Sequence, residues 1–186
     1  MAANPGPNSE EEICPEVMVF RGKVQNLLFI IIISLFSVST ISMAEDAADP
    51  RAYPCENDDA FRAFDFWVGE WDVHLPDGTL AGTNSIAKAE RGCMLVERWT
   101  STGGGTGTSI NYLDKTSGEW VQVWNAASGS QIHIRGGMTA DGMFLVGTLH
   151  SVGAGTTLAF RGLWTLLDDG RVRQYFDQSA DGGETW

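Results

Sequence analysis

The sequence predicts an all-β fold, an antiparallel up-and-down meander of about ten strands closed into a barrel, with a short N-terminal capping helix and a truncated last strand. Two observations predict it. Apolar runs alternate with glycine-bearing turns over residues 66–186, and no segment between those turns is long and polar enough for a crossover helix. Consecutive strands joined by short turns are antiparallel neighbours, and closing the sheet removes two long exposed edges. A two-sheet sandwich is the structural alternative.

Composition sets the class of partner. The chain has 186 residues, 43% of them hydrophobic, which is enough for one packed domain with an N-terminal extension. Its formal net charge is −12, and its basic residues form no cluster. An acidic surface repels phosphate backbones, so no nucleic-acid partner is expected. The oligomeric state is left open.

The first 44 residues are predicted to be an N-terminal extension and a secretory signal peptide. Met18–Lys23 is a short basic segment, Leu27–Val38 is apolar, and Ser42–Ala44 offers small residues at a cleavage site. The apolar run is short for a membrane span, although an uncleaved anchor is the alternative. Cleavage would leave a periplasmic or secreted protein, not held in a membrane, that begins at Glu45.

The acidic stretch before Met18 is unusual because signal peptides begin close to the N-terminus. Met18 is therefore expected to be the true start. In an exported chain, Cys55 and Cys93 are a possible disulfide between the segment before the helix and the start of the third strand. Two separate thiols are the alternative.

The elements follow in order from residue 45. Residues 45–65 are expected to be an extended leader and a short helix, with an N-cap at Asn57–Asp59 and with Phe61 and Phe64 on one face. The helix is too short to be stable alone and would pack on the barrel opening. The barrel domain covers 66–186, and its predicted strands are 66–75, 79–90, 93–101, 106–114, 119–126, 131–138, 143–150, 156–167 and 171–178. Residues 184–186 are expected to begin a last strand.

Five motifs resemble a family of exported bacterial proteins of unknown function with a calycin- or lipocalin-like barrel. The motifs are FDFWVGEWDV (64–73), GCMLVERW (92–99), WVQVW (120–124), DGRVRQ (169–174) and SADGGETW (179–186). The resemblance covers about residues 55–186 and implies the barrel fold and export, with no known activity. It also implies a closing strand after the last motif.

Gly69-x-Trp71 on the first strand resembles the lipocalin signature. There the tryptophan plugs the base of the barrel and an arginine from a late strand packs across it. Arg161 and Arg173 are the candidates for that arginine. The structural roles implied for Gly69 and Trp71 do not by themselves indicate a function.

A more distant resemblance is to the haem-binding, nitrobindin-like members of the same superfamily, which use a proximal histidine. Here His74, His133 and His150 are single and scattered, without a paired ligand motif. Neither a haem cofactor nor a metal site is expected. The single Ser179–Trp186 box that resembles the sialidase Asp-box is expected to be a turn, because a propeller needs repeated blades.

Polar residues that alternate with tryptophans are the best indication of a ligand pocket. A period of two places Trp120, Gln122 and Trp124 on one face of their strand, and Glu97 and Trp99 on one face of another. A barrel interior that holds a ligand needs apolar walls and a few polar groups. The predicted ligand-binding residues are Trp71, Glu97, Trp99, Asn111, Gln122 and Trp124. Outward-facing or mutually satisfied polar groups are the alternative.

The sequence therefore favours an exported protein that binds a small apolar or amphipathic ligand, rather than an enzyme. No G-x-S-x-G elbow or phosphate loop is present. One alternative is a barrel-type isomerase or hydrolase that uses Glu97 as acid or base, since a carboxylate desolvated beside Trp99 would have a raised pKa. A structural module of the cell envelope with a filled barrel is the other.

Overall fold

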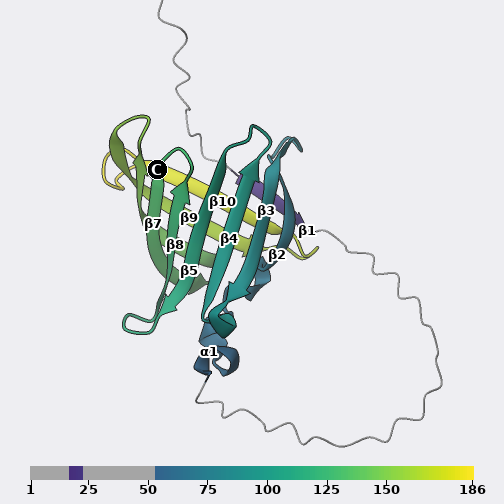
Figure 1. Ribbon diagram of the computed structural model, residues 1–186. Helices are drawn as coiled ribbons and strands as arrows, with labels where there is room; N and C mark the ends of the chain where they lie inside the picture. Colours follow the sequence, from purple (N-terminus) through teal and green to yellow (C-terminus); the bar gives the residue numbers. More distant parts are fainter. Residues whose placement is uncertain (1–16, 23–52) are drawn as a thin grey trace, which may run out of the picture.

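The computed structural model describes residues 17–22 and 53–186. Nine strands, β2 to β10, follow one another as antiparallel neighbours, and β1 lies between β10 and β2 and closes the barrel (Figure 1). The strands are β1 (Val17–Gly22), β2 (Gly69–His74), β3 (Leu80–Ala89), β4 (Met94–Ser101), β5 (Thr106–Asp114), β6 (Glu119–Ala126), β7 (Gln131–Thr139), β8 (Gly142–Ser151), β9 (Thr156–Leu166) and β10 (Val172–Ser179). The predicted all-β antiparallel meander is confirmed.

Two predicted strand limits were wrong. The first strand of the meander begins at Gly69 rather than at 66, because Asp65–Trp67 form a short 3-10 helix, η2. Residues 184–186 form no strand. Instead the Asp181 carboxylate accepts hydrogen bonds from the backbone N–H and the hydroxyl of Thr185 and from the Ser179 hydroxyl. These bonds lower the pKa of Asp181 and hold the segment as the expected turn.

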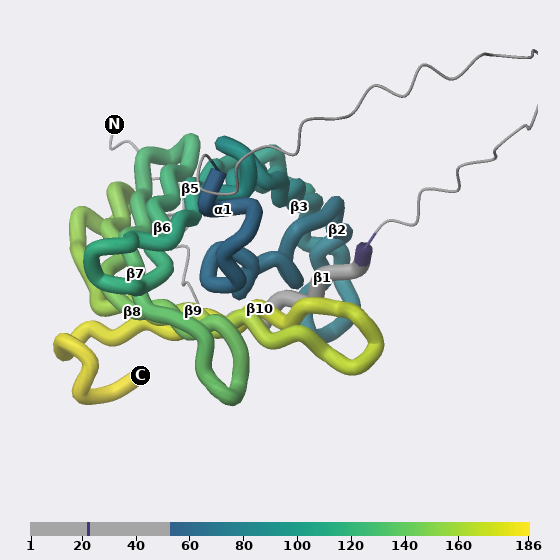
Figure 2. The backbone as a smooth tube through the Cα atoms, turned by 90° about the horizontal axis from the view of Figure 1, so that it is seen from below, coloured from purple at the N-terminus to yellow at the C-terminus, as the bar shows by residue number. Residues whose placement is uncertain are grey.

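The helix expected around 57–64 is divided into short pieces. A single α-helical turn, α1 (Pro54–Asn57), precedes the 3-10 helix η1 (Asp59–Arg62). The Asp58 side chain caps η1 by accepting from the Ala60 N–H at 2.9 Å. Viewed from below, this segment lies within the outline of the barrel (Figure 2). It covers the lower opening, as predicted.

Residues 53–67, which we call the cap, are held by an aromatic cluster at the base of the barrel. The ring of Phe64 stacks on Trp67 at 5.0 Å between centroids and meets the edges of Trp120 and Trp164 at 5.7 and 5.4 Å. Trp164 also contacts Phe176 at 5.7 Å. Phe64, Trp67 and Trp164 are fully buried. Such aromatic pairs add about 1 kcal/mol each to the stabilisation from burial, so the cap and the barrel share one core.

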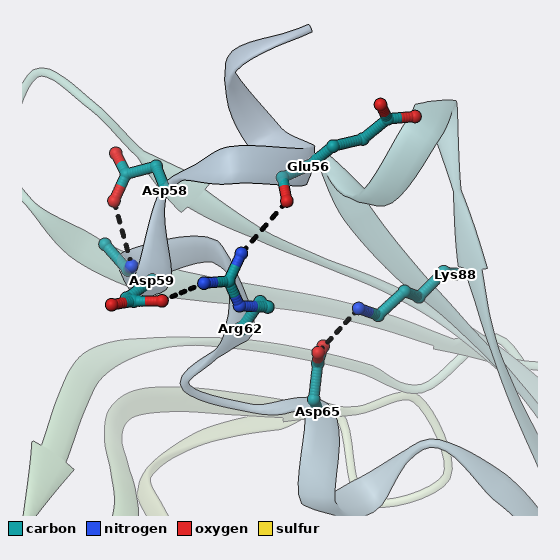
Figure 3. A network of polar contacts seen from close by, with 7 residues as sticks. Glu56, Asp58, Asp59, Arg62, Asp65 and Lys88 are labelled. Carbon is teal, nitrogen blue, oxygen red and sulfur yellow. Dashed lines mark hydrogen bonds and ion pairs between the residues drawn. The ribbon is translucent and has the colours of Figure 1, made fainter. Parts of the chain in front are cut away.

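Polar contacts and a disulfide fasten the outside of the cap. Cys55 and Cys93 form the disulfide, which confirms the predicted pairing. Lys88 of β3 pairs with Asp65 at 2.5 Å, and Arg62 donates to Asp59 and to the Glu56 carbonyl (Figure 3). These surface ion pairs are worth at most about 1 kcal/mol each. The disulfide, whose Cys55 is buried at the edge of the core, is therefore a stronger attachment of the cap than any one of these ion pairs.

The predicted export segment overlaps β1. Backbone pairs join β1 to β10 from Val17↔Tyr175 to Phe20↔Val172, and to β2 from Val19↔His74 to Gly22↔Trp71. The basic segment Met18–Lys23 therefore largely coincides with a strand of the barrel. The apolar run, the cleavage site and the acidic residues at the start of the chain lie outside the described residues. Among the described helices, none has the length and apolar character needed to cross a membrane.

Candidate functional site in the barrel interior

A row of buried polar side chains crosses four neighbouring strands. Strand alternation turns Asn84 of β3, Glu97 of β4, Ser109 and Asn111 of β5 and Gln122 of β6 away from solvent, each at 5% exposure or less. Glu97 pairs in register with Ser109, and Asn111 pairs with Gln122. Side chains at directly opposed positions are close enough to interact. The register therefore brings residues 84, 97, 109, 111 and 122 into one network.

The network is continuous. The Asn84 amide donates to one Glu97 oxygen at 2.7 Å, and the Ser109 hydroxyl donates to the other at 2.6 Å. The Asn111 amide donates to the Ser109 oxygen at 2.8 Å, and the Gln122 amide donates to the Asn111 carbonyl oxygen at 2.8 Å. The donors thus converge on Glu97, from Asn84 of β3 on one side and from Ser109, Asn111 and Gln122 on the other. Chains of this kind strengthen each member by polarisation.

Glu97 is the titratable member of this row. Burial raises the pKa of its carboxyl to about 7, against the lowering effect of the hydrogen bonds from Ser109 and Asn84. Over residues 53–186, no lysine, arginine or histidine forms an ion pair with it. A small change of pH near neutrality therefore changes the charge inside the barrel.

Apolar and aromatic side chains lie on the same strand faces as the polar row. Leu95 and Leu113 are buried two residues from Glu97 and Asn111 on the same faces, and Ile134 of β7 is buried opposite Gln122. The partly buried Trp99 packs against the core. Apolar walls with a few directional polar groups are the composition of small-molecule sites.

The indole of Trp124 lies directly over Gly107. A Cβ atom added at Gly107 would lie 2.0 Å from Cζ2 of Trp124. A Cβ atom added at Gly82 would lie 2.2 Å from the backbone carbonyl oxygen of Thr100 and 2.7 Å from Cη2 of Trp99. Because glycine has no Cβ, the rings of Trp99 and Trp124 can lie close to the neighbouring strand at these two positions.

Replacing Gly107 should therefore move Trp124. Gly107→Ala is expected to lower the free energy of unfolding by about 1–3 kcal/mol through overpacking and to shift the tryptophan emission. Gly137→Ala is the matched control, because Gly137 is also a strand glycine but has open space around its added Cβ. Urea denaturation followed by fluorescence measures both. Equal stability of the two variants would contradict the packing described.

Several buried polar atoms have no hydrogen-bond partner among the described residues. They include Oδ1 of Asn84 and Oε1 of Gln174, two acceptors, and the indole Nε1 of Trp67 and Trp164, two donors. Buried polar groups in proteins are nearly always satisfied, so these atoms are exceptions within the interior. Asn84 is the one that belongs to the Glu97 network.

The predicted ligand-binding residues are largely brought together. Glu97, Asn111 and Gln122 join one network, and Trp99 and Trp124 lie on the same faces of β4 and β6. Trp71 is buried in the core, and its indole donates to the Trp67 carbonyl at 2.9 Å. Sequence reasoning missed Asn84 and Gln174. Both alternate with buried neighbours in their strands, and that pattern would have found them.

The expectation that Arg161 or Arg173 packs across Trp71 was wrong. Arg161 donates to Asp177 at 2.7 Å and lies 4.3 Å from the ring of Trp186. Arg173 is exposed. Both arginines alternate with inward-facing residues of their strands, so they point away from the interior. Gly69 does leave room for Trp71, because a Cβ atom added at Gly69 would lie 3.3 Å from the Trp71 indole.

The three histidines do not meet. His150 Nδ1 lies 3.0 Å from the Thr157 hydroxyl, and His74 and His133 lie on β2 and β7. Over the described ranges, no group of three or more metal-binding side chains is present.

The chain matches no protein-family model and no curated protein. The resemblance to exported calycin-like proteins, drawn from the motifs above, stays a prediction.

Proposed function

We propose that the protein is an exported binding protein for a small amphipathic molecule, held inside the barrel with its polar end at Glu97. The observation that supports this most is the row of buried polar side chains that converge on a carboxylate without a cationic partner among residues 53–186. A filled structural barrel gains nothing from such a group, because its desolvation costs several kcal/mol.

The polar atoms of the site indicate the chemistry of the ligand. Glu97 in its charged form accepts hydrogen bonds, and Asn84 Oδ1 is a buried acceptor without a partner among the described residues. A ligand head group that donates hydrogen bonds, such as an amine, would satisfy both and would also neutralise the carboxylate. The aliphatic part of the ligand would contact the apolar residues and Trp124.

Titration with dodecylamine and lauric acid, which have equal chain lengths, tests this proposal. Saturable quenching of tryptophan fluorescence is expected, with the amine binding at least about tenfold tighter above pH 7, a difference of about 1.4 kcal/mol. Glu97→Gln should remove the preference for the amine. Glu70→Gln is the matched control, since Glu70 is an exposed carboxylate bonded to Ser85 on the outer face of β2.

Two further variants test which tryptophan is quenched by the bound ligand. Trp124→Phe should weaken the quenching, while Trp186→Phe should preserve it, because Trp186 lies outside the barrel against Arg161. Absence of saturable binding by either amphiphile, or an unchanged preference in Glu97→Gln, would contradict the proposal.

An acid–base enzyme is the second candidate, favoured by the raised pKa of Glu97, since catalytic acids and bases work best with a pKa near the ambient pH. Both Glu97 oxygens already accept short hydrogen bonds from Asn84 and Ser109, which suits a fixed binding group better than a group that shuttles protons. Turnover that Glu97→Gln abolishes would favour the enzyme.

A further inference from the structure

The two ends of the nine-strand meander run in the same direction. β2 and β10 both pair antiparallel to β1, so they are parallel to one another. Edge strands expose unpaired backbone N–H and C=O groups, and two parallel edges cannot join in the antiparallel ladder that the rest of the sheet uses. A strand that runs opposite to both is needed between them. We call this position, between β2 and β10, the seam.

β1 occupies the seam, and its sequence shows which residue types lie at the register positions there. Phe20 stands at the register position between Val73 and Val172, which are both fully buried. Arg21 stands opposite Asp72. Gly22 stands opposite Trp71, and a Cβ atom added at Gly22 would lie 3.9 Å from the indole. β1 thus places an apolar, a basic and a small residue at three successive register positions of the seam.

The attachment of β1 to the rest of the chain passes through the predicted cleavage site. Residues 23–53 connect β1 to α1 and include the small residues up to Ala44. Cleavage after Ala44, which rests on the export prediction, would cut β1 from the barrel and leave the edges of β2 and β10 unpaired. A protein exported in that form needs another strand at the same place.

We propose that the seam is a strand-acceptor site, which binds an extended segment of a partner polypeptide antiparallel to both β2 and β10. The backbone pairs give affinity, and the register positions beside Val73, Asp72 and Trp71 select an apolar, a basic and a small residue in that order. The part of the chain after residue 44 carries 20 acidic and 10 basic side chains, and its net charge of −10 favours a basic segment over an acidic one. This site is separate from the Glu97 network and does not depend on ligand binding in the interior.

The test uses the full chain with a specific protease site inserted between residues 44 and 45, cut after folding. A fluorescent peptide of residues 15–24 (PEVMVFRGKV) is titrated and its anisotropy is measured. The cut protein should bind the peptide saturably, and the intact protein at least about tenfold more weakly, because its tethered β1 competes at high effective concentration. Peptides carrying Phe20→Asp or Val19→Pro should also bind at least about tenfold more weakly.

Three results would overturn the proposal. One is equal binding of the peptide by the cut and the intact protein, and another is equal binding of the parent and the Phe20→Asp peptides. The third is self-association of the cut protein without peptide binding, measured by light scattering, which would assign the seam to a second copy of the chain. Dodecylamine titration of the intact protein is a separate readout, so failure of ligand binding is distinguishable from failure of strand binding.

A second variant covers the case in which the cut protein unfolds. In the full chain, Val19→Pro removes a backbone donor from β1 at the positions paired with His74 and Arg173. Hydrogen exchange of the β2 and β10 amides should become faster, and the added parent peptide should restore their protection. Unchanged exchange in this variant would equally overturn the proposal.

Discussion

Raising the pH from about 4.5 to 7 should lower the free energy of unfolding by about 3 kcal/mol, because burial raises the pKa of Glu97 to about 7 from an ordinary value of 4.5. Over this window the folded state holds a proton that the unfolded state has released. The contribution of Glu97 to the free energy of unfolding is therefore fully present below the ordinary pKa and is lost as the pH rises through the folded-state pKa. Above that pKa it does not change further.

Other carboxylates act in a different window. Hydrogen bonds lower the pKa values of Asp58, Asp77, Asp114 and Asp169 below the ordinary 3.8. Because their folded-state pKa values are lowered, their contribution is present above the ordinary value and is lost as the pH falls below it. They therefore do not mask the slope that Glu97 produces between about pH 5 and 7.

Glu97→Gln isolates the effect of the carboxyl group. Glutamine has the shape of the protonated carboxyl, and reversal of the Asn84 amide would present Oδ1 to the new amide hydrogens. Urea midpoints of this variant should be nearly independent of pH between 5 and 8, whereas Glu70→Gln should follow the wild type. An unchanged slope in Glu97→Gln would show that the carboxyl is not the source.

Removing the disulfide should destabilise the protein by about 4 kcal/mol in the chain-entropy model, since Cys55 and Cys93 are 38 residues apart and close a long loop. The double variant Cys55→Ala/Cys93→Ala frees the segment that leads into the aromatic cluster of Phe64 and Trp67. The cap should therefore open before the barrel unfolds.

Urea denaturation with and without reductant measures the disulfide contribution. Reduced wild type and the double alanine variant should have similar midpoints, both below that of the oxidised wild type. Hydrogen exchange should be fastest in residues 53–67 of the double variant. A loss below about 1 kcal/mol would contradict the entropic account and would mean that the core and the ion pairs around Asp65 hold the cap without the disulfide.

Most of the sheet could be predicted because its signals are local. Between Thr106 and Ala126 the observed strands β5 and β6 agree with the predicted limits, since Thr116–Gly118 supply turn residues between two alternating runs. The start of β2 was placed too early because Phe66 and Trp67 look like strand residues. In η2, Trp67 packs against Trp164, which lies far along the sequence.

The candidate site could likewise be predicted only where its signals lie within one strand. Alternation within β4, β5 and β6 identified which neighbours share a face with Glu97, Asn111 and Gln122, but not that these faces point inward or that Asn84 of β3 donates to Glu97. That contact depends on the register between strands, which no single strand encodes. Arg161 was misplaced for a related reason, because its partner Asp177 becomes visible only when β9 and β10 pair.

By itself, the sequence determined the all-β class, the order of the strands in the meander and which residues share a strand face, because alternation and turn chemistry are properties of neighbouring residues. Only the tertiary structure decided which inward residues meet, how Glu97 comes to be buried among Asn84 and Ser109, and that Val17–Gly22 lies between β2 and β10. The physical reason is that register and closure depend on hydrogen bonds and packing between segments far apart in the chain.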